Sequence, residues 1–239
     1  MNIYSYVVSK IISNPKICRK VLLLGGIAVI PLMVIASLRL SLNIKIPDMT
    51  RDVAAIGGIH PLSGFLSSLG ILFWWTSSSI WFFSAIIKRQ INSDANIKFQ
   101  IYSGLLSLYL ALDDLFQFHE HIAPNHLKLP ELVIYLIFLF LISSYVWNFK
   151  DILMKNEALL AKISIFFLAG SVFVDIFLEG FLLWTIKNWS YLIEDGLKWL
   201  GIFYWAAFSV EYCIFDLKHT IDLKHTIDLK HTIDLKNKL

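Results

Sequence analysis

The stretch "PLSGFLSSLGILFWWTSSSIWFFSAII", residues 61–87, contains no charged side chain. As a helix it is long enough to cross the hydrocarbon core of a bilayer, which takes about 20 residues. Over the whole chain 57% of the residues are hydrophobic and 16% are charged, whereas soluble domains are about half apolar and about a quarter charged. The sequence therefore predicts an integral membrane protein.

Five further apolar runs are candidate spans, at residues 21–38, 99–118, 132–149, 163–186 and 191–214. In lipid the backbone must satisfy its own hydrogen bonds, which favours helices. The alternation that a membrane β-barrel requires is absent from these runs. We therefore predict an all-α, integral membrane helical bundle of about six transmembrane helices. Residues 1–215 would form this transmembrane domain.

The distribution of Lys and Arg predicts the orientation. With the N-terminus in the cytoplasm, 15 of these residues lie inside and five lie outside. The inside residues are in the polar N-terminal segment, the inner loops and the tail. Cytoplasmic loops of membrane proteins carry such an excess, so we expect both termini to be cytoplasmic. The basic residues are scattered between apolar runs and form no patch, which argues against a nucleic-acid partner. The two cysteines are too few for a disulfide framework.

Residues 216–239 are a repeated C-terminal tail, in which "DLKHTI" occurs three times and is followed by "DLK". Its strict period of two is typical of a strand, but one short strand cannot bury a face alone. We interpret the tail as a weakly ordered cytoplasmic extension that arose by repeat expansion. A metal-binding tail is the alternative, because each repeat contributes one histidine.

The stretch "LALDDLFQFHEH", residues 110–121, places several ionisable side chains inside an apolar region. The predicted topology brings carboxylates and histidines from four segments to the outer side. The residues concerned are His60, Asp113, Asp114, Glu120, His121, Asp175, Glu179, Glu194 and Asp195. At about 100° per residue, Asp113, Asp114, Glu120 and His121 share one arc of a continuous helix. His119 would point away from that arc.

These acidic groups outnumber the basic groups near them, and a charge inside a membrane is costly unless it is paired, hydrated or bound. A divalent metal ion would balance the excess, with oxygen and imidazole ligands favouring Zn, Fe, Mn or Mg. The candidate metal ligands are His60, Asp113, Glu120, His121, Asp175 and Glu179. No established metal-binding motif is present among them. The alternative is a hydrated outer vestibule without a bound metal.

The segments "ALDDLFQFHE" (111–120) and "YLIEDGLKWLGIFYW" (191–205) together resemble a group of bacterial multi-pass membrane proteins. The shared features are an acidic pair, a His-Glu pair close behind it, and a second acidic pair that opens a late helix. The resemblance implies a polytopic bundle in a bacterial inner membrane and a site shared by the two segments, without implying an activity. It also implies that His119 turns inward if its helix ends near Phe118.

Three functions are compatible with these features. The first is an outer-side carboxylate and histidine cation site, as in a metal-dependent enzyme that acts on a lipid or lipid-linked substrate. In that case a metal-bound water would be the nucleophile, and Asp114 or Glu194 would accept the proton. The second is a cation- or proton-coupled transporter or channel-like protein that uses the same carboxylates. The third is a non-catalytic membrane scaffold. Membrane lipids are the expected partners.

Overall fold

A computed structural model of the chain describes residues 15–50, 53–60, 62–91, 96–178, 185 and 189–236. These residues form helices joined by short turns, and no strand occurs among them. The expectation of an all-α fold is therefore confirmed. The chain divides into two units, Met1–Ser63 and Gly64–Leu239.

The first unit contains the helix α2 (Pro15–Leu42) and the short helices α3 (Ile46–Thr50) and α4 (Val53–Gly57). Large apolar side chains of α2, such as Leu22 and Leu40, are exposed. A helix that shows apolar residues on all sides is suited to lipid and not to water. The expected first span, 21–38, lies within this helix.

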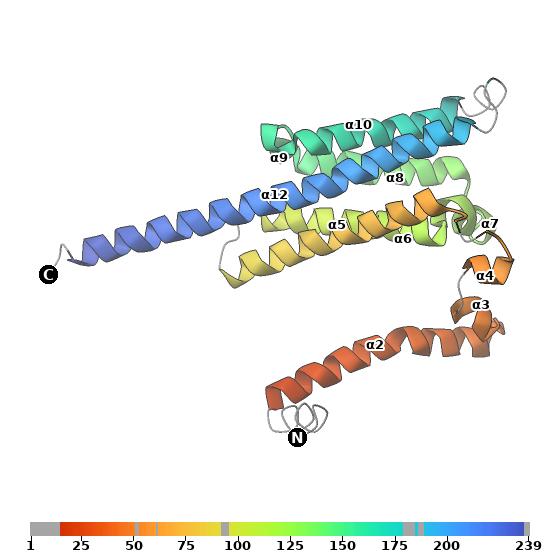
Figure 1. Ribbon diagram of the computed structural model, residues 1–239, viewed down its shortest axis with the longest axis horizontal. Helices are drawn as coiled ribbons and strands as arrows, with labels where there is room; N and C mark the ends of the chain where they lie inside the picture. The colour runs from red at the N-terminus through yellow and green to blue at the C-terminus, as the bar shows by residue number, and fades with distance from the viewer. Residues whose placement is uncertain are drawn as a thin grey trace. The chain divides into compact units, whose positions relative to one another are not determined.

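The second unit holds the bundle (Figure 1). Its long helices are α5 (Phe65–Gln90), α6 (Ile97–Phe116), α8 (Glu131–Asn148), α10 (Leu159–Phe173) and α12 (Trp189–Lys236). Shorter elements join them: η1 (Phe118–Ile122), α7 (Ala123–Asn125), α9 (Lys150–Leu153), η2 (Asn156–Ala158) and η3 (Val174–Leu178). The helix α5 packs against α6 and α12, and α10 packs against α12.

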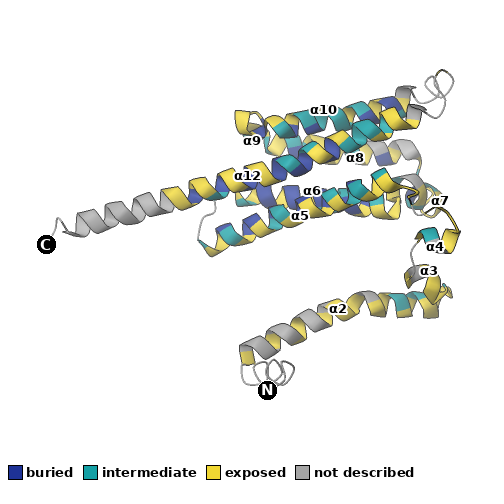
Figure 2. Cartoon of the chain, viewed as in Figure 1, coloured by how far each residue is buried: buried dark blue, intermediate teal, exposed yellow. Residues whose placement is uncertain are grey.

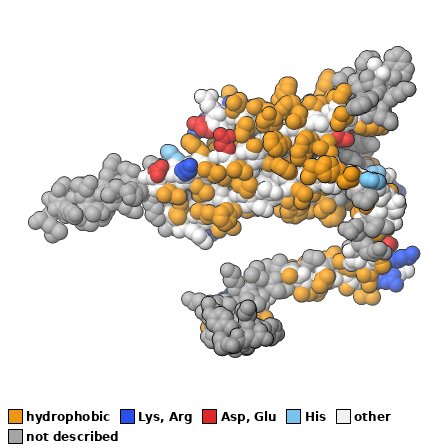
Figure 3. Space-filling view, viewed as in Figure 1, with side chains coloured by type: hydrophobic (Ala, Val, Ile, Leu, Met, Phe, Trp, Pro, Cys, Tyr) orange, Lys and Arg blue, Asp and Glu red, His pale blue; other side chains and the backbone are white. Residues whose placement is uncertain are grey.

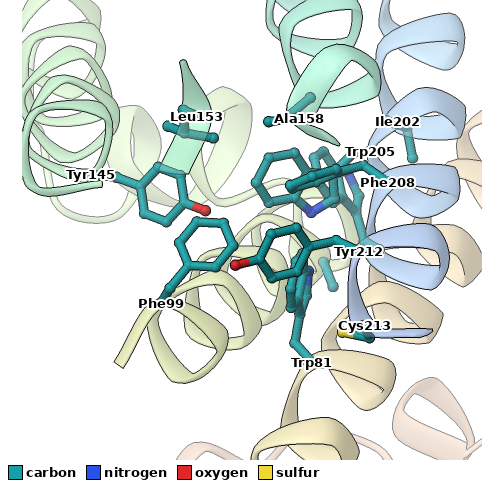
Figure 4. Close-up of a cluster of buried hydrophobic side chains, with 13 residues drawn as sticks. Trp81, Phe99, Tyr145, Leu153, Ala158, Ile202, Trp205, Phe208, Tyr212 and Cys213 are labelled. Carbon is teal, nitrogen blue, oxygen red and sulfur yellow. The ribbon is translucent and has the colours of Figure 1, made fainter. Parts of the chain in front are cut away.

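An aromatic cluster fills the interior between these helices (Figure 4). The fully buried Trp81 of α5 lies with its ring centroid 5.4 Å from Phe99 of α6 and 5.5 Å from Phe208 of α12. Tyr145 brings α8 to the same cluster through its contact with Phe99. Aromatic contacts of this kind add stability beyond the area that they bury. The three-dimensional positions of the helices therefore depend on this cluster.

The face of the second unit that Figure 3 shows is mostly apolar, and much of the surface of its helices is exposed or half-buried (Figure 2). Leu72 of α5, Phe140 of α8 and Phe166 of α10 are all exposed. A broad exposed apolar surface is unusual for a protein in water. Three helical segments are long and apolar enough to cross a membrane, namely Phe65–Gln90, Asn156–Ile176 and Tyr191–Asp222. Shorter apolar helices cover Ala28–Leu42 and Leu136–Asn148.

The helix α12 continues into the repeated tail. It runs without a break from Trp189 to Lys236, past the expected domain boundary after residue 215. Asp216 and Thr220 are buried, and the Thr220 hydroxyl donates to the Asp216 carbonyl oxygen at 2.7 Å. Adding a residue to an existing helix costs far less than starting one. The buried part of α12 can therefore extend a helix into a repeat whose own pattern resembles a strand.

Candidate functional site

The carboxylate of Asp114 links three helices of the bundle. It lies in the last turn of α6 and accepts hydrogen bonds from two side chains. The donors are Trp74 Nε1 of α5, at 3.1 Å, and Lys198 Nζ of α12, at 2.7 Å. The Asp114 side chain is 9% exposed and that of Lys198 is 37% exposed. Asp114 is therefore a shielded anion with a cationic partner that reaches the surface.

The neighbouring Asp113 is buried and is held by the backbone and side chain of His119. The His119 backbone N–H donates to Asp113 Oδ1 at 3.2 Å, and the imidazole Nδ1 contacts Asp113 Oδ2. His119 can reach back to Asp113 because α6 ends at Phe116 and Gln117 adopts a left-handed conformation with φ 49°. The π-helical segment η1 then begins in a new direction. The His119 ring also makes a T-shaped contact with Phe138 of α8, with ring centroids 5.7 Å apart.

The early helix end corrects the expected positions of the histidines. A continuous helix through residue 121 would align His121 with Asp113 and turn His119 away. Because α6 stops at Phe116, His119 instead contacts Asp113, as the resemblance implies for a helix that ends at this point. His121 is exposed, and its printed contact is made by its backbone N–H to the Gln117 carbonyl oxygen.

Asp114 and His119 border a cavity of about 190 Å³ at the end of the second unit where α7 lies (Figure 1). Its lining residues come from the start of α5, the end of α6 and the first turns of α12. They are Leu66, Ser67, Asp114, Gln117, His119, Asp195, Lys198, Trp199 and Ile202. We call this space the outer cavity. It combines two carboxylates, one ammonium, one imidazole and an indole ring.

The remaining candidate residues lie in different places. Glu194 is half-buried on α12, one position before the cavity-lining Asp195. Asp175 is half-buried within the π-helical segment η3. His60 belongs to the first unit, where its Nδ1 accepts a hydrogen bond from the Leu62 backbone N–H at 3.2 Å. Two acidic candidates are not described further: Glu179 lies outside the described residues, as does the side chain of Glu120.

No group of three or more His, Cys, Asp or Glu residues in the described part of the chain is placed to hold a metal ion. Asp113 and Asp114, the two acidic residues at the end of α6, contact an imidazole and an ammonium group respectively. These two carboxylates therefore have ionisable partners within the chain, while the metal site stays a prediction.

The sequence segment that holds this site matches a known family profile. Residues 22–212 match a family described as "Domain of unknown function (DUF8692)". The chain belongs to this family. The family segment contains all residues of the outer cavity. Comparisons with curated proteins and with solved structures give no match.

A second ionic centre lies where α5 ends and α6 begins, and the sequence did not predict it; one of its residues, Asp216, lies beyond the family segment. Lys88, near the end of α5, is fully buried, and its Nζ lies 2.6 Å from Asp216 Oδ2 of α12. Asn96 and Gln100, at the start of α6, also donate to the Asp216 carboxylate. Lys88 reads in sequence as a basic loop residue and Asp216 as the first residue of the tail. No local pattern signals that the two residues meet.

Proposed function

We propose that the chain is a polytopic protein of a bacterial inner membrane that binds a proton or a small cation in the outer cavity. In this proposal it crosses the bilayer about six times and keeps both termini in the cytoplasm. The apolar surface and the three long apolar helices support a membrane location. The excess of Lys and Arg in the expected inner loops supports the orientation.

One observation carries the proposal: the buried Asp113 contacts the imidazole of a histidine that borders the outer cavity. A carboxylate on one ring nitrogen orients an imidazole and stabilises its protonated form. His119 is therefore built to gain a proton at the cavity and to return it. Asp113 acts through His119 and is a positioning residue.

The charges around the outer cavity favour a cation as the ligand. Asp114 and Asp195 contribute two negative charges, Lys198 contributes one positive charge, and a neutral His119 leaves the lining net negative. The indole of Trp199 offers an aromatic face, which attracts ammonium groups. A proton, a monovalent metal cation or the ammonium group of a lipid headgroup fits this lining. The volume of about 190 Å³ is sufficient for a small group of this kind.

A histidine titration tests the proposal. With ¹⁵N-labelled histidine in lipid nanodiscs, the imidazole signals of His119 should titrate, and Asp113→Asn should lower the pH at which His119 gains its proton. The reason is that a neutral amide in place of the Asp113 carboxylate no longer stabilises the protonated imidazole of His119. His126→Gln, at an exposed loop histidine, is the matched control and should leave the His119 signals unchanged. A His119 titration that does not respond to Asp113→Asn would contradict the proposal.

Cation binding is tested on the same samples. Thermal unfolding should shift upward with Na⁺, K⁺ or ethanolammonium in the wild type, since a ligand that binds only the folded state stabilises it. The shift should be lost in Asp195→Asn, since this variant removes the charge that leaves the lining net negative. Elemental analysis of the purified protein covers the divalent metals. If the wild type contains a stoichiometric metal ion and Asp113→Asn loses it, the site binds a metal ion and not a proton.

Proton- or cation-coupled transport is the second candidate, and a polar face on α6 favours it. Gln100, Ser103 and Ser107 are fully buried and occupy one side of this helix, which leads to Asp114 in its last turn. Ser103 Oγ lies 2.6 Å from the Tyr145 hydroxyl, and Ser107 Oγ accepts from Trp205 Nε1 at 2.8 Å. Polar groups therefore continue from the outer cavity toward the second ionic centre.

Vesicles that contain a pH-sensitive dye distinguish the two candidates. A transporter should move protons when a membrane potential is applied, and His119→Gln should abolish the flux. An unchanged internal pH, together with intact cation binding, would leave the outer cavity as a binding or enzymatic site. If the outer cavity binds no cation and His119 does not titrate, the remaining candidate function is a non-catalytic membrane scaffold.

A further inference from the structure

The second ionic centre is a buried network on three helices. We call it the inner network, and it consists of Lys88, Asn96, Gln100 and Asp216. Asp216 Oδ2 lies 2.6 Å from Lys88 Nζ and 2.7 Å from Gln100 Nε2, while Oδ1 lies 3.0 Å from Asn96 Nδ2. A buried ion pair is tolerated only when further hydrogen bonds surround it. The Asp216 carboxylate meets this condition.

Three buried polar atoms beside this network form no hydrogen bond to a nitrogen or oxygen atom of the described residues, although the Ser84 hydroxyl has the Cys213 thiol, a weak partner, beside it. They are Trp81 Nε1, Ser84 Oγ and Gln100 Oε1. Trp81 and Ser84 share the face of α5 that carries Lys88, because the three positions are spaced i, i+3 and i+7. Gln100 belongs to the network itself and follows Phe99, whose ring lies 5.4 Å from that of Trp81. The three atoms therefore belong to one region of the interior.

The chemistry of these atoms indicates their ligand. The indole N–H is only a donor, the amide oxygen is only an acceptor, and the hydroxyl is both. Buried polar groups are almost always hydrogen-bonded, and internal water typically makes about three such bonds to groups that lack a protein partner. Water is the smallest molecule that can accept from Trp81 and donate to Gln100.

We propose that the inner network is a hydrated site, in which internal water molecules bind Trp81 Nε1, Ser84 Oγ and Gln100 Oε1 next to the Lys88–Asp216 pair. These waters exchange with solvent and so keep the buried pair in contact with it. The site is separate from the outer cavity: Gln100 and Asp114 are 14 residues apart on α6, which corresponds to about 21 Å along a helix. The proposal does not depend on the ligand of the outer cavity.

Hydrogen exchange at two indole groups tests the proposal. Trp81 and Trp205 are both buried, with 0% and 3% of their surface exposed, and their ring centroids lie 6.4 Å apart. Trp205 Nε1 donates to Ser107 Oγ at 2.8 Å and serves as the internal control. Opening of the bundle would expose both rings together, whereas internal water would act on Trp81 alone.

The measurement uses the full chain with ¹⁵N-labelled tryptophan in nanodiscs, transferred to D₂O. Trp81→Phe and Trp205→Phe assign the two signals. We expect the Trp81 indole proton to exchange at least about tenfold faster than that of Trp205, as hydrogen exchange resolves local differences in protection. A nuclear Overhauser contact between the Trp81 N–H and water should accompany it. Equal or slower exchange at Trp81 would overturn the proposal and would leave the outer cavity untouched.

Discussion

The Lys88–Asp216 pair offers a quantitative test of how the bundle is held together. Lys88 is fully buried and the Asp216 side chain is 9% exposed. Removing one partner leaves the other as an uncompensated buried charge, which typically costs about 3–5 kcal/mol. Replacing both partners by apolar residues removes the desolvation cost together with the attraction and is often close to neutral. The two substitutions should therefore be strongly non-additive.

The assay is a double-mutant cycle in mixed micelles, with the free energy of unfolding measured by SDS titration. Lys88→Met and Asp216→Leu should each lower that free energy by about 3–5 kcal/mol. The double variant should recover most of the summed loss of about 6–10 kcal/mol, which gives a coupling energy of more than about 3 kcal/mol. Asn96 and Gln100 will still lose their acceptor in the double variant, so recovery should be incomplete. A coupling below about 0.5 kcal/mol, as in exposed pairs, would refute the buried geometry.

Two further substitutions test the helix packing and the end of α6. Gly201→Ala should destabilise the bundle by about 1–3 kcal/mol, because a Cβ atom at this position would lie 2.6 Å from Leu168 Cγ of α10. Gly196→Ala is the control, since it is also on α12 but its Cβ would have no atom within 4 Å. In thermal unfolding the control should be neutral or slightly stabilising. Gln117→Gly should raise the melting temperature or leave it unchanged, because glycine adopts the positive φ of 49° without strain; a large loss of stability would show that the left-handed turn is not present.

The sequence predicts the helices better than their contacts. The uncharged stretch 61–87 contains most of α5 because length and composition alone determine that it can span a bilayer. Three of the expected spans correspond to helices that are long and apolar enough to cross a membrane, while the total of six stays a prediction. The contacts of Asp114 with Trp74 and Lys198 join residues far apart in the chain. No periodicity within one segment can indicate such contacts.

The position of His119 shows where helical geometry fails. An arc calculated at about 100° per residue holds only while the helix continues, and the left-handed Gln117 interrupts it. Asparagine and glycine are the usual signals for such an end, and a glutamine gives no comparable signal. In the repeated tail, the period of two describes the repeat, whereas the structure extends the helix α12 through it to Lys236.

The two ionic contacts of α12 also restrict how this helix can move. Lys198 and Asp216 are 18 residues apart on α12, about 27 Å along the axis, and both bind side chains of α6. The Lys198–Asp114 contact with α6 is 2.7 Å long and the Asp216–Lys88 contact with α5 is 2.6 Å long. Sliding α12 by one turn of about 5.4 Å would therefore break both at once. Rocking about one contact while the other opens requires the loss of only one. Neutralising Asp114 would therefore free the Lys198 end of α12 and leave the Asp216 end as the pivot. Neutralising Asp216 would do the reverse.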